Sequence, residues 1–247
     1  ARQSNSGVYL EGKRKVRKKG LGNGSGENSI FFLHLVEQRR LRPFFVGFAT
    51  ILYTALAAFA LLAFREEGMD SRISFLVYIG VTAFSMFFLT MDNPLLNDLQ
   101  QPIFYYMPGS SYKKVLWSSF SPMIYTMIDL LPSLLVLAVL AKIRLPLLFI
   151  GFFLVLSFYL IYLSAQMLAF WLMGTIKGTI ASLVYFLLRF ILLLPATALI
   201  IAAGVLGVAG SAAWYYFFVI AALIVNIVIF LSSSLAGRQQ LRAGLNE

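Results

Sequence analysis

The chain has 247 residues, of which 60% are hydrophobic and 12% charged, and its mean hydropathy is +0.84. Soluble domains are about 45–50% apolar and about 25% charged, so this composition excludes a water-soluble globule and indicates an integral membrane protein. The absence of cysteine excludes disulfides and thiolate sites, and a single histidine excludes a His-rich zinc site. The net charge of +10 favours anionic lipid headgroups over nucleic acid as a partner, because much of it flanks an apolar span.

The chain is expected to begin with a flexible, basic cytoplasmic segment over residues 1–28. Residues 20–26 have the composition of a linker, and they lack the Gly-Lys-Ser/Thr sequence that a phosphate-binding loop requires. Residues 29–42 then combine an apolar run with clustered arginines, and Pro43 marks a break before the first span. This pattern predicts an amphipathic helix lying in the cytoplasmic interface. The alternative is a cytoplasmic extension of the first span.

The remaining residues, 43–242, are expected to form a six-helix transmembrane domain, which makes the fold all-α. A bilayer core requires about 20 apolar residues in helix, and runs of this length recur along the chain. Helices are favoured over barrel strands because the runs are apolar at every position instead of alternating. A group of glycines and a serine at residues 204–211 predicts a turn that divides the last long run in two. The expected spans are about 44–64, 73–91, 116–141, 145–173, 178–203 and 213–236.

The distribution of basic residues predicts the orientation. With six spans, fifteen lysines and arginines fall on the side of the two chain ends and four on the opposite side. Basic residues collect on the cytoplasmic side of membrane proteins. We therefore expect a multi-pass protein of the cell membrane with both termini in the cytoplasm.

The longest connection between spans is the predicted cytoplasmic loop 92–115. It contains the run Phe104, Tyr105, Tyr106 and Met107, which is not the composition of a disordered segment. Pro108 and Gly109 predict a turn, and Ser110 or Ser111 is expected to cap a helix that continues into the third span. Exposed aromatic residues on the cytoplasmic side indicate a surface that docks another molecule. The alternative is that these rings lie on the membrane.

Two charged residues fall within the predicted spans. Asp129 lies in the third span and Arg189 in the fifth, at depths that differ by only about 3 Å at 1.5 Å per residue. Because an isolated charge in the bilayer centre costs about 2.5–3.5 kcal/mol, we expect the two to pair inside the bundle, with Asn226 of the sixth span as a further polar partner. Such a pair either fixes helix packing or forms a polar contact for substrate or a gate.

The order of these elements and the loop sequence resemble the permease half of type-2 ABC exporters. In that family an apolar or aromatic residue, Pro-x-Ser and basic residues precede the third span. The matching residues here are Met107, Pro108, Ser110, Lys113 and Lys114. Residues 31–40 similarly resemble the family's entry helix, most closely in the bacterial group named "putative ABC exporter".

The resemblance implies an ABC-type ATPase subunit as a partner on the 92–115 loop, and a second permease half, either as a homodimer or in a fused chain. The residues expected to form the ATPase-docking surface are Phe104, Tyr105, Tyr106, Met107, Pro108, Ser110, Lys113 and Lys114. The predicted function is export of an unidentified substrate, driven by ATP hydrolysis on the partner.

Two other classes of function compete with this one. The alternative is a non-transporting membrane scaffold or assembly factor that uses the aromatic loop to dock another partner. An intramembrane enzyme is disfavoured, because one Asp and one Arg at mid-membrane offer no acid–base pair or activated nucleophile. The sequence contains no Walker motif. We therefore expect no catalytic residue, cofactor or metal in this chain.

Overall fold

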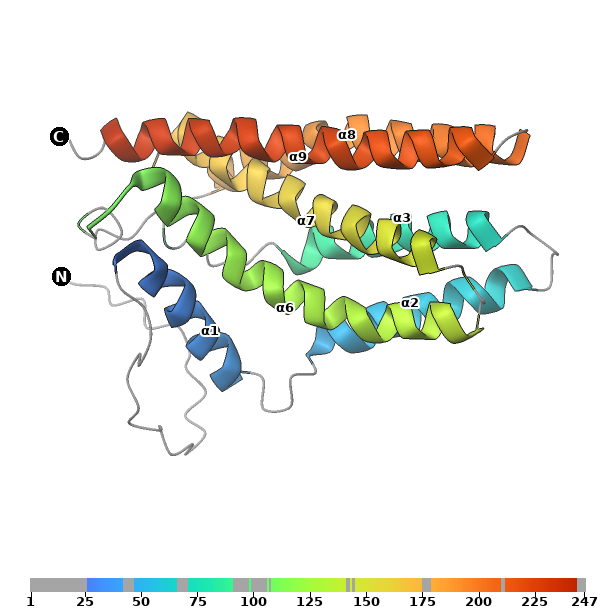
Figure 1. Ribbon diagram of the computed structural model, residues 1–247. Helices are drawn as coiled ribbons and strands as arrows, with labels where there is room; N and C mark the ends of the chain where they lie inside the picture. The colour runs from blue at the N-terminus through green and yellow to red at the C-terminus, as the bar shows by residue number, and fades with distance from the viewer. Residues whose placement is uncertain are drawn as a thin grey trace.

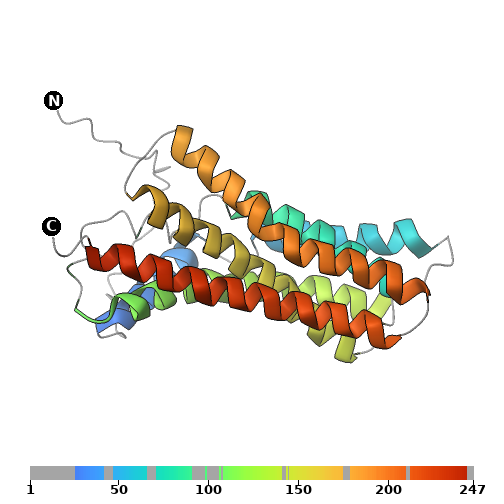
Figure 2. The ribbon, with the colours of Figure 1, turned by 90° about the horizontal axis from the view of Figure 1, so that it is seen from above.

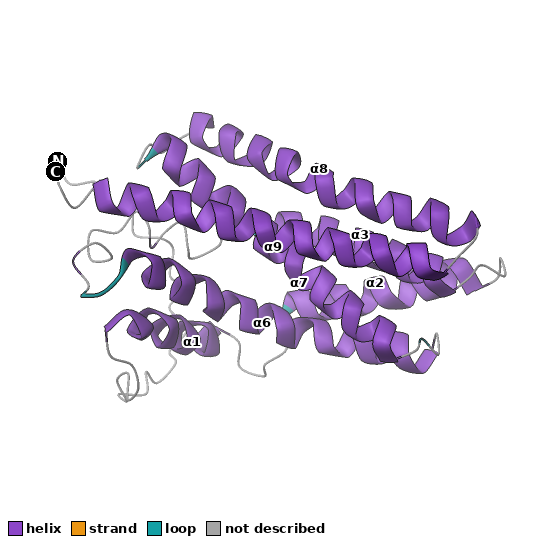
Figure 3. Ribbon diagram, turned by 45° about the horizontal axis from the view of Figure 1, so that its top comes forward, coloured by secondary structure: helices purple, strands orange, loops and turns teal. Residues whose placement is uncertain are grey.

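The computed structural model of the protein describes a set of helices and the short connections between some of them. Every element of the described residues is a helix (Figure 3). The described residues are 26–41, 47–65, 71–90, 98, 106, 108–140, 143, 145–174, 179–209 and 212–243.

The helices form an elongated bundle in which six long helices run alongside one another (Figure 1). A single 3-10 turn and a shorter helix precede them and pack against the first half of α6. In chain order the elements are η1 (Gly26–Asn28), α1 (Ser29–Leu41), α2 (Phe48–Arg65), α3 (Ser71–Leu89), α6 (Ser111–Leu140), α7 (Leu145–Met173), α8 (Thr179–Ala209) and α9 (Ala212–Ala243).

Among the described residues, five helices are long and apolar enough to cross a membrane: α3, α6, α7, α8 and α9. The apolar part of α2, Phe48–Leu62, is shorter. It lies within the first predicted span, so a sixth crossing by α2 stays a prediction. The predicted all-α, polytopic membrane architecture is confirmed.

The long helices differ in length, and this sets where the loop between α3 and α6 begins. α2 and α3 have 18 and 19 residues, about 27–29 Å, which matches a hydrocarbon core of about 30 Å. α6, α7, α8 and α9 have 29 to 32 residues and extend further, to an end where α6 and α8 begin and α7 and α9 end. We call this the basal end of the bundle. Figures 1 and 2 show that α3 stops part-way along the bundle, well before the basal end.

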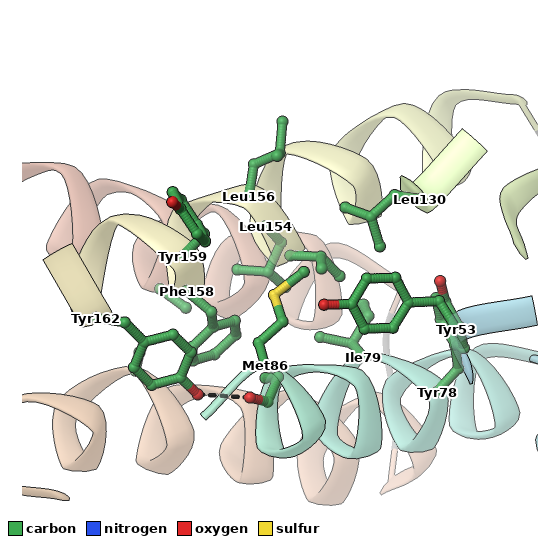
Figure 4. Close-up of a cluster of buried hydrophobic side chains, with 14 of the residues drawn as sticks. Tyr53, Tyr78, Ile79, Met86, Leu130, Leu154, Leu156, Phe158, Tyr159 and Tyr162 are labelled. Atoms are coloured by element: carbon green, nitrogen blue, oxygen red, sulfur yellow. Dashed lines mark hydrogen bonds between the residues drawn. The ribbon is translucent and has the colours of Figure 1, made fainter. Parts of the chain in front are cut away.

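α7 lies at the centre of the bundle and α8 at its edge. In the apolar, membrane-length part of each helix, 72% of the residues of α7 are buried, but only 17% of those of α8. α7 contacts α3, α6, α8 and α9. Figure 4 shows Ile79 and Met86 of α3 against Leu154, Phe158 and Tyr162 of α7, all nearly inaccessible. The broad apolar surface of α8 is of the kind that faces lipid.

A close approach between α3 and α7 depends on one glycine. A Cβ atom at Gly151 would lie 2.0 Å from Cζ of the Phe75 ring, which is fully buried. The ring therefore occupies the space that any other side chain at position 151 would fill, and α7 can approach α3 only because residue 151 is glycine.

The end of α8 differs from the prediction. The fifth span was expected to end at residue 203, before a glycine turn, but α8 continues through Gly204 and Gly207 to Ala209. Glycine lowers helix stability by only about 1 kcal/mol relative to alanine, so it does not end a helix that is packed against neighbours. At Gly204 an added Cβ would lie 3.5 Å from Leu76 of α3, which is ordinary contact.

Candidate docking segment and buried polar residues

The exposed turn before α6 carries the described part of the predicted docking surface. Tyr106 is 83% exposed, and Pro108, Ser110 and Lys113 are also exposed. Lys114 differs from the prediction, because its side chain is only 3% exposed and so does not belong to the open surface. α6 begins at Ser111, as the capping prediction required. The remaining predicted docking residues lie outside the described residues: Phe104, Tyr105 and Met107.

The end of this turn is held by η1, and we call this contact the first anchor. The Ser110 N–H donates to Oε1 of Glu27 over 2.9 Å. The hydrogen bond from Ser110 is the main reason that the pKa of Glu27 is lowered, and the positive charges of Lys113 and Lys114 also contribute. Gly109 has a φ of 124°, a conformation that favours glycine, and a Cβ there would overlap the Glu27 side chain.

Asp98 forms the second anchor, in the middle of the loop. Its Oδ1 and Oδ2 lie 3.2 and 3.1 Å from Nε2 of His34 on α1, and Oδ2 also accepts a hydrogen bond from the Ser118 hydroxyl of α6. His34 and Ser118 are almost completely buried. One carboxylate therefore joins the loop to both α1 and α6.

Further contacts hold α1 along α6. The hydroxyl of Tyr125 donates to the carbonyl of Leu35 over 3.0 Å, and the rings of Phe31 and Trp117 have centroids 5.6 Å apart. Ile30 is 3% exposed. α1 is thus part of the packed bundle at its basal end. Whether it also lies in the membrane interface, as predicted, stays a prediction.

The third anchor holds the start of the loop, where α3 ends. Nη1 of Arg189 donates to the carbonyl of Phe87, and Nη2 donates to the carbonyl and the hydroxyl of Thr90 over 2.7 and 2.9 Å. Nε2 of Gln166 on α7 donates to the same Thr90 carbonyl over 3.4 Å. The same nitrogen also donates to the Tyr185 hydroxyl of α8 over 3.0 Å. α3, α7 and α8 therefore meet at one carbonyl group.

Arg189 is enclosed by aromatic rings and has no exposed surface. Its guanidinium carbon lies 4.3 Å from the ring centroid of Tyr185, 5.1 Å from that of Tyr162 and 5.3 Å from that of Phe87. Aromatic faces attract a cation, and the attraction grows when water is excluded. The rings and the helix carbonyls together explain how the bundle tolerates this buried charge.

The predicted pair of Asp129 and Arg189 is wrong, because the structure gives the two charges different partners. Oδ1 of Asp129 accepts a hydrogen bond from the Thr50 hydroxyl of α2 over 2.5 Å. Asn226, the expected third member, donates instead from Nδ2 to the Ser157 hydroxyl of α7 over 2.8 Å. Similar depth in the membrane was the basis of the prediction, but depth does not specify which helix faces meet.

Most anchor residues could not be recognised from the sequence. His34 is the single histidine of the chain, and its rarity was the one available signal. Glu27 and Asp98 resemble ordinary loop carboxylates until their partners, 83 and 64 residues away, are known. Gln166 and Thr90 lie inside apolar runs where a single polar residue is unremarkable.

The fold and these buried polar contacts define a polytopic α-helical membrane protein. The chain belongs to the family described as Putative ABC exporter, which matches residues 2–236. The protein is therefore a component of an ABC-type transporter. No curated protein and no solved structure matches the chain.

Proposed function

We propose that the chain is the permease component of an ABC exporter, and that a separate ATPase subunit docks on the 92–115 loop. The protein lies in the cell membrane with both termini in the cytoplasm, so that the basal end faces the ATPase. A second permease half, as a homodimer or in a fused chain, completes the translocation path. We expect no catalytic residue, cofactor or metal in this chain.

One observation carries this proposal: contacts at Thr90, Asp98 and Ser110 join the start, the interior and the exposed turn of the loop to the neighbouring helices. An ATPase can drive a permease only if its movement passes from the docking surface into the membrane helices. The first anchor joins the turn to η1, the second joins the loop to α1 and α6, and the third joins its start to α7 and α8. The proposed docking surface begins with three aromatic residues and continues with four others: Phe104, Tyr105 and Tyr106, then Met107, Pro108, Ser110 and Lys113.

Co-purification from the native membrane tests the docking. An ABC ATPase, identified by mass spectrometry, should accompany the full chain. We expect Lys113→Glu and Pro108→Ala to reduce its recovery by about tenfold, as loss of one strong interface residue does. Arg39→Glu is the matched control, because Arg39 is an exposed basic residue of α1 outside the docking surface.

Two results would contradict the proposal. Absence of any ATPase beside the unaltered chain would remove the function itself. An ATPase that stays bound after deletion of residues 100–112 would show that docking takes place elsewhere. Recovery of a different protein in place of the ATPase would favour a scaffold.

A further inference from the structure

α3 ends at Leu89, and Arg189 donates hydrogen bonds to carbonyl groups of its last turn. The final carbonyls of any helix lack intrahelical partners, and in a membrane an unsatisfied backbone group costs several kcal/mol. The guanidinium of Arg189 binds the Phe87 and Thr90 carbonyls, and a cation at this end also favours the helix dipole. α3 can therefore end inside the bundle, well before the basal end.

The position of this contact allows it to transmit movement of the loop to another helix. Thr90 is the last described residue before the docking loop, so any displacement of the loop acts on the last turn of α3. Arg189 lies ten residues, or about 15 Å, beyond the first residue of α8. The contact thus reaches from the base of the loop to the middle part of a different helix.

We propose that Arg189 is a positioning residue that couples the docking loop to the α7–α8 part of the bundle, by holding the Phe87 and Thr90 carbonyls at the end of α3. The inference rests on the proposed ATPase docking. Without this clamp, movement of the loop would still enter α6, which follows it directly in the chain, but the end of α3 would keep only the Gln166 hydrogen bond and the packing of Phe87 against α8, so less of the movement would reach α8.

The clamp requires arginine specifically. Its planar guanidinium places two nitrogens on two acceptor residues at once, whereas a lysine ammonium is a single point of charge. Arg189→Lys keeps the charge inside the aromatic cage and is the conservative variant. Arg189→Gln removes both the charge and the second donor nitrogen.

Hydrogen exchange of the chain alone tests whether the clamp exists. We expect Arg189→Gln to accelerate exchange in the last turn of α3 by about tenfold, which corresponds to about 1.4 kcal/mol. The centre of α7 should be unaffected. Unchanged exchange at the end of α3 would overturn the proposal, because the clamp would then not stabilise that turn.

Spin-label distances in the complex with the ATPase test the coupling. The chain has no cysteine, so labels can be placed at will. One label pair joins Leu131→Cys on α6 to Ile201→Cys on α8 and reports whether movement reaches α8, and a second joins Leu131→Cys to Phe84→Cys on α3 and reports movement of α3 itself. All three positions are exposed. Distances are compared between the nucleotide-free complex and the complex with ATP and a hydrolysis-deficient ATPase.

The two label pairs separate the possible results. In the unaltered background both distances should change with nucleotide. Arg189→Gln should strongly reduce the change between α6 and α8 and keep the change between α6 and α3, and Arg189→Lys should reduce the change between α6 and α8 by a smaller amount. The matched control Asn226→Leu alters another fully buried polar residue and should keep both changes.

Each other result contradicts a defined statement. If Arg189→Gln keeps the full change between α6 and α8, the coupling role is wrong. If it loses both changes, Arg189 acts on docking itself and the coupling role is again wrong. If the unaltered complex shows no change in either distance, the proposed ATPase docking fails, and the inference fails with it.

Discussion

Replacing Asp98 by alanine should release α1 from the bundle. Asp98 accepts hydrogen bonds from His34 and Ser118, and hydrogen bonds to a charged group contribute about 1.5–3 kcal/mol each. The side chain of His34 is only 4% exposed, so it would be left buried without its partner, whereas that of Asp98 is 14% exposed and partly screened. We therefore expect the lower end of the range, about 3 kcal/mol for the two bonds together.

The assay is thiol labelling of a buried reporter. Ile30→Cys places the only cysteine of the chain on α1, at a core position that is 3% exposed. Its labelling rate measures local opening of α1, so a loss of about 3 kcal/mol should accelerate labelling about 100-fold in Asp98→Ala. Asp98→Asn keeps an acceptor oxygen and should accelerate it by less than about tenfold. A second reporter, Ala203→Cys on α8, should be unaffected in both variants.

A double-mutant cycle with His34→Ala checks the cause. Because His34 and Asp98 are in contact, their combined effect should fall short of the sum by about 1–2 kcal/mol. Additive effects, or an acceleration below about threefold in Asp98→Ala, would refute the reasoning. Equal acceleration at both reporters would also refute it, since the variant would then unfold the whole bundle instead of releasing α1.

Three further predictions concern other contacts. Gly151→Ala should lower the unfolding free energy in detergent by about 1–3 kcal/mol, and Phe75→Leu in the same chain should restore part of it; a worse double variant would contradict the overlap. Because the pKa of Glu27 is lowered, its carboxylate should stabilise the start of α6 fully above its ordinary pKa of 4.5 and lose this effect as the pH falls through the lowered pKa. Amide exchange at the start of α6 between pH 6 and 3 should show this dependence, and Glu27→Gln should remove it. Asn226→Leu should lower the temperature of thermal unfolding by less than Ser157→Ala. Asn226→Leu also removes the Oδ1 atom that has no partner among the described residues, whereas Ser157→Ala leaves the buried Nδ2 donor of Asn226 unpaired.

The sequence alone predicted the helices and much of the exposed turn. Apolar runs of membrane length require helices, because only a helix satisfies its own backbone within a single segment. The start of α6 was also predictable, since Pro108, Gly109 and the serines act through local backbone geometry. These signals depend on neighbouring residues in the chain, so they survive without knowledge of the fold.

The sequence could not show which polar groups meet. Asp129 pairs with Thr50, 79 residues away, and Arg189 with the Phe87 carbonyl, 102 residues away, although hydropathy placed both charges correctly inside apolar helices. Hydropathy and residue counting give depth along a helix. They do not give the rotation of the helix about its own axis or its neighbours, which are set by packing. Only the tertiary structure decided that Arg189 binds the carbonyl groups at the end of α3 instead of neutralising a carboxylate. Carbonyl groups without an intrahelical partner are present at every helix end, so the sequence does not show which of them a buried arginine will bind.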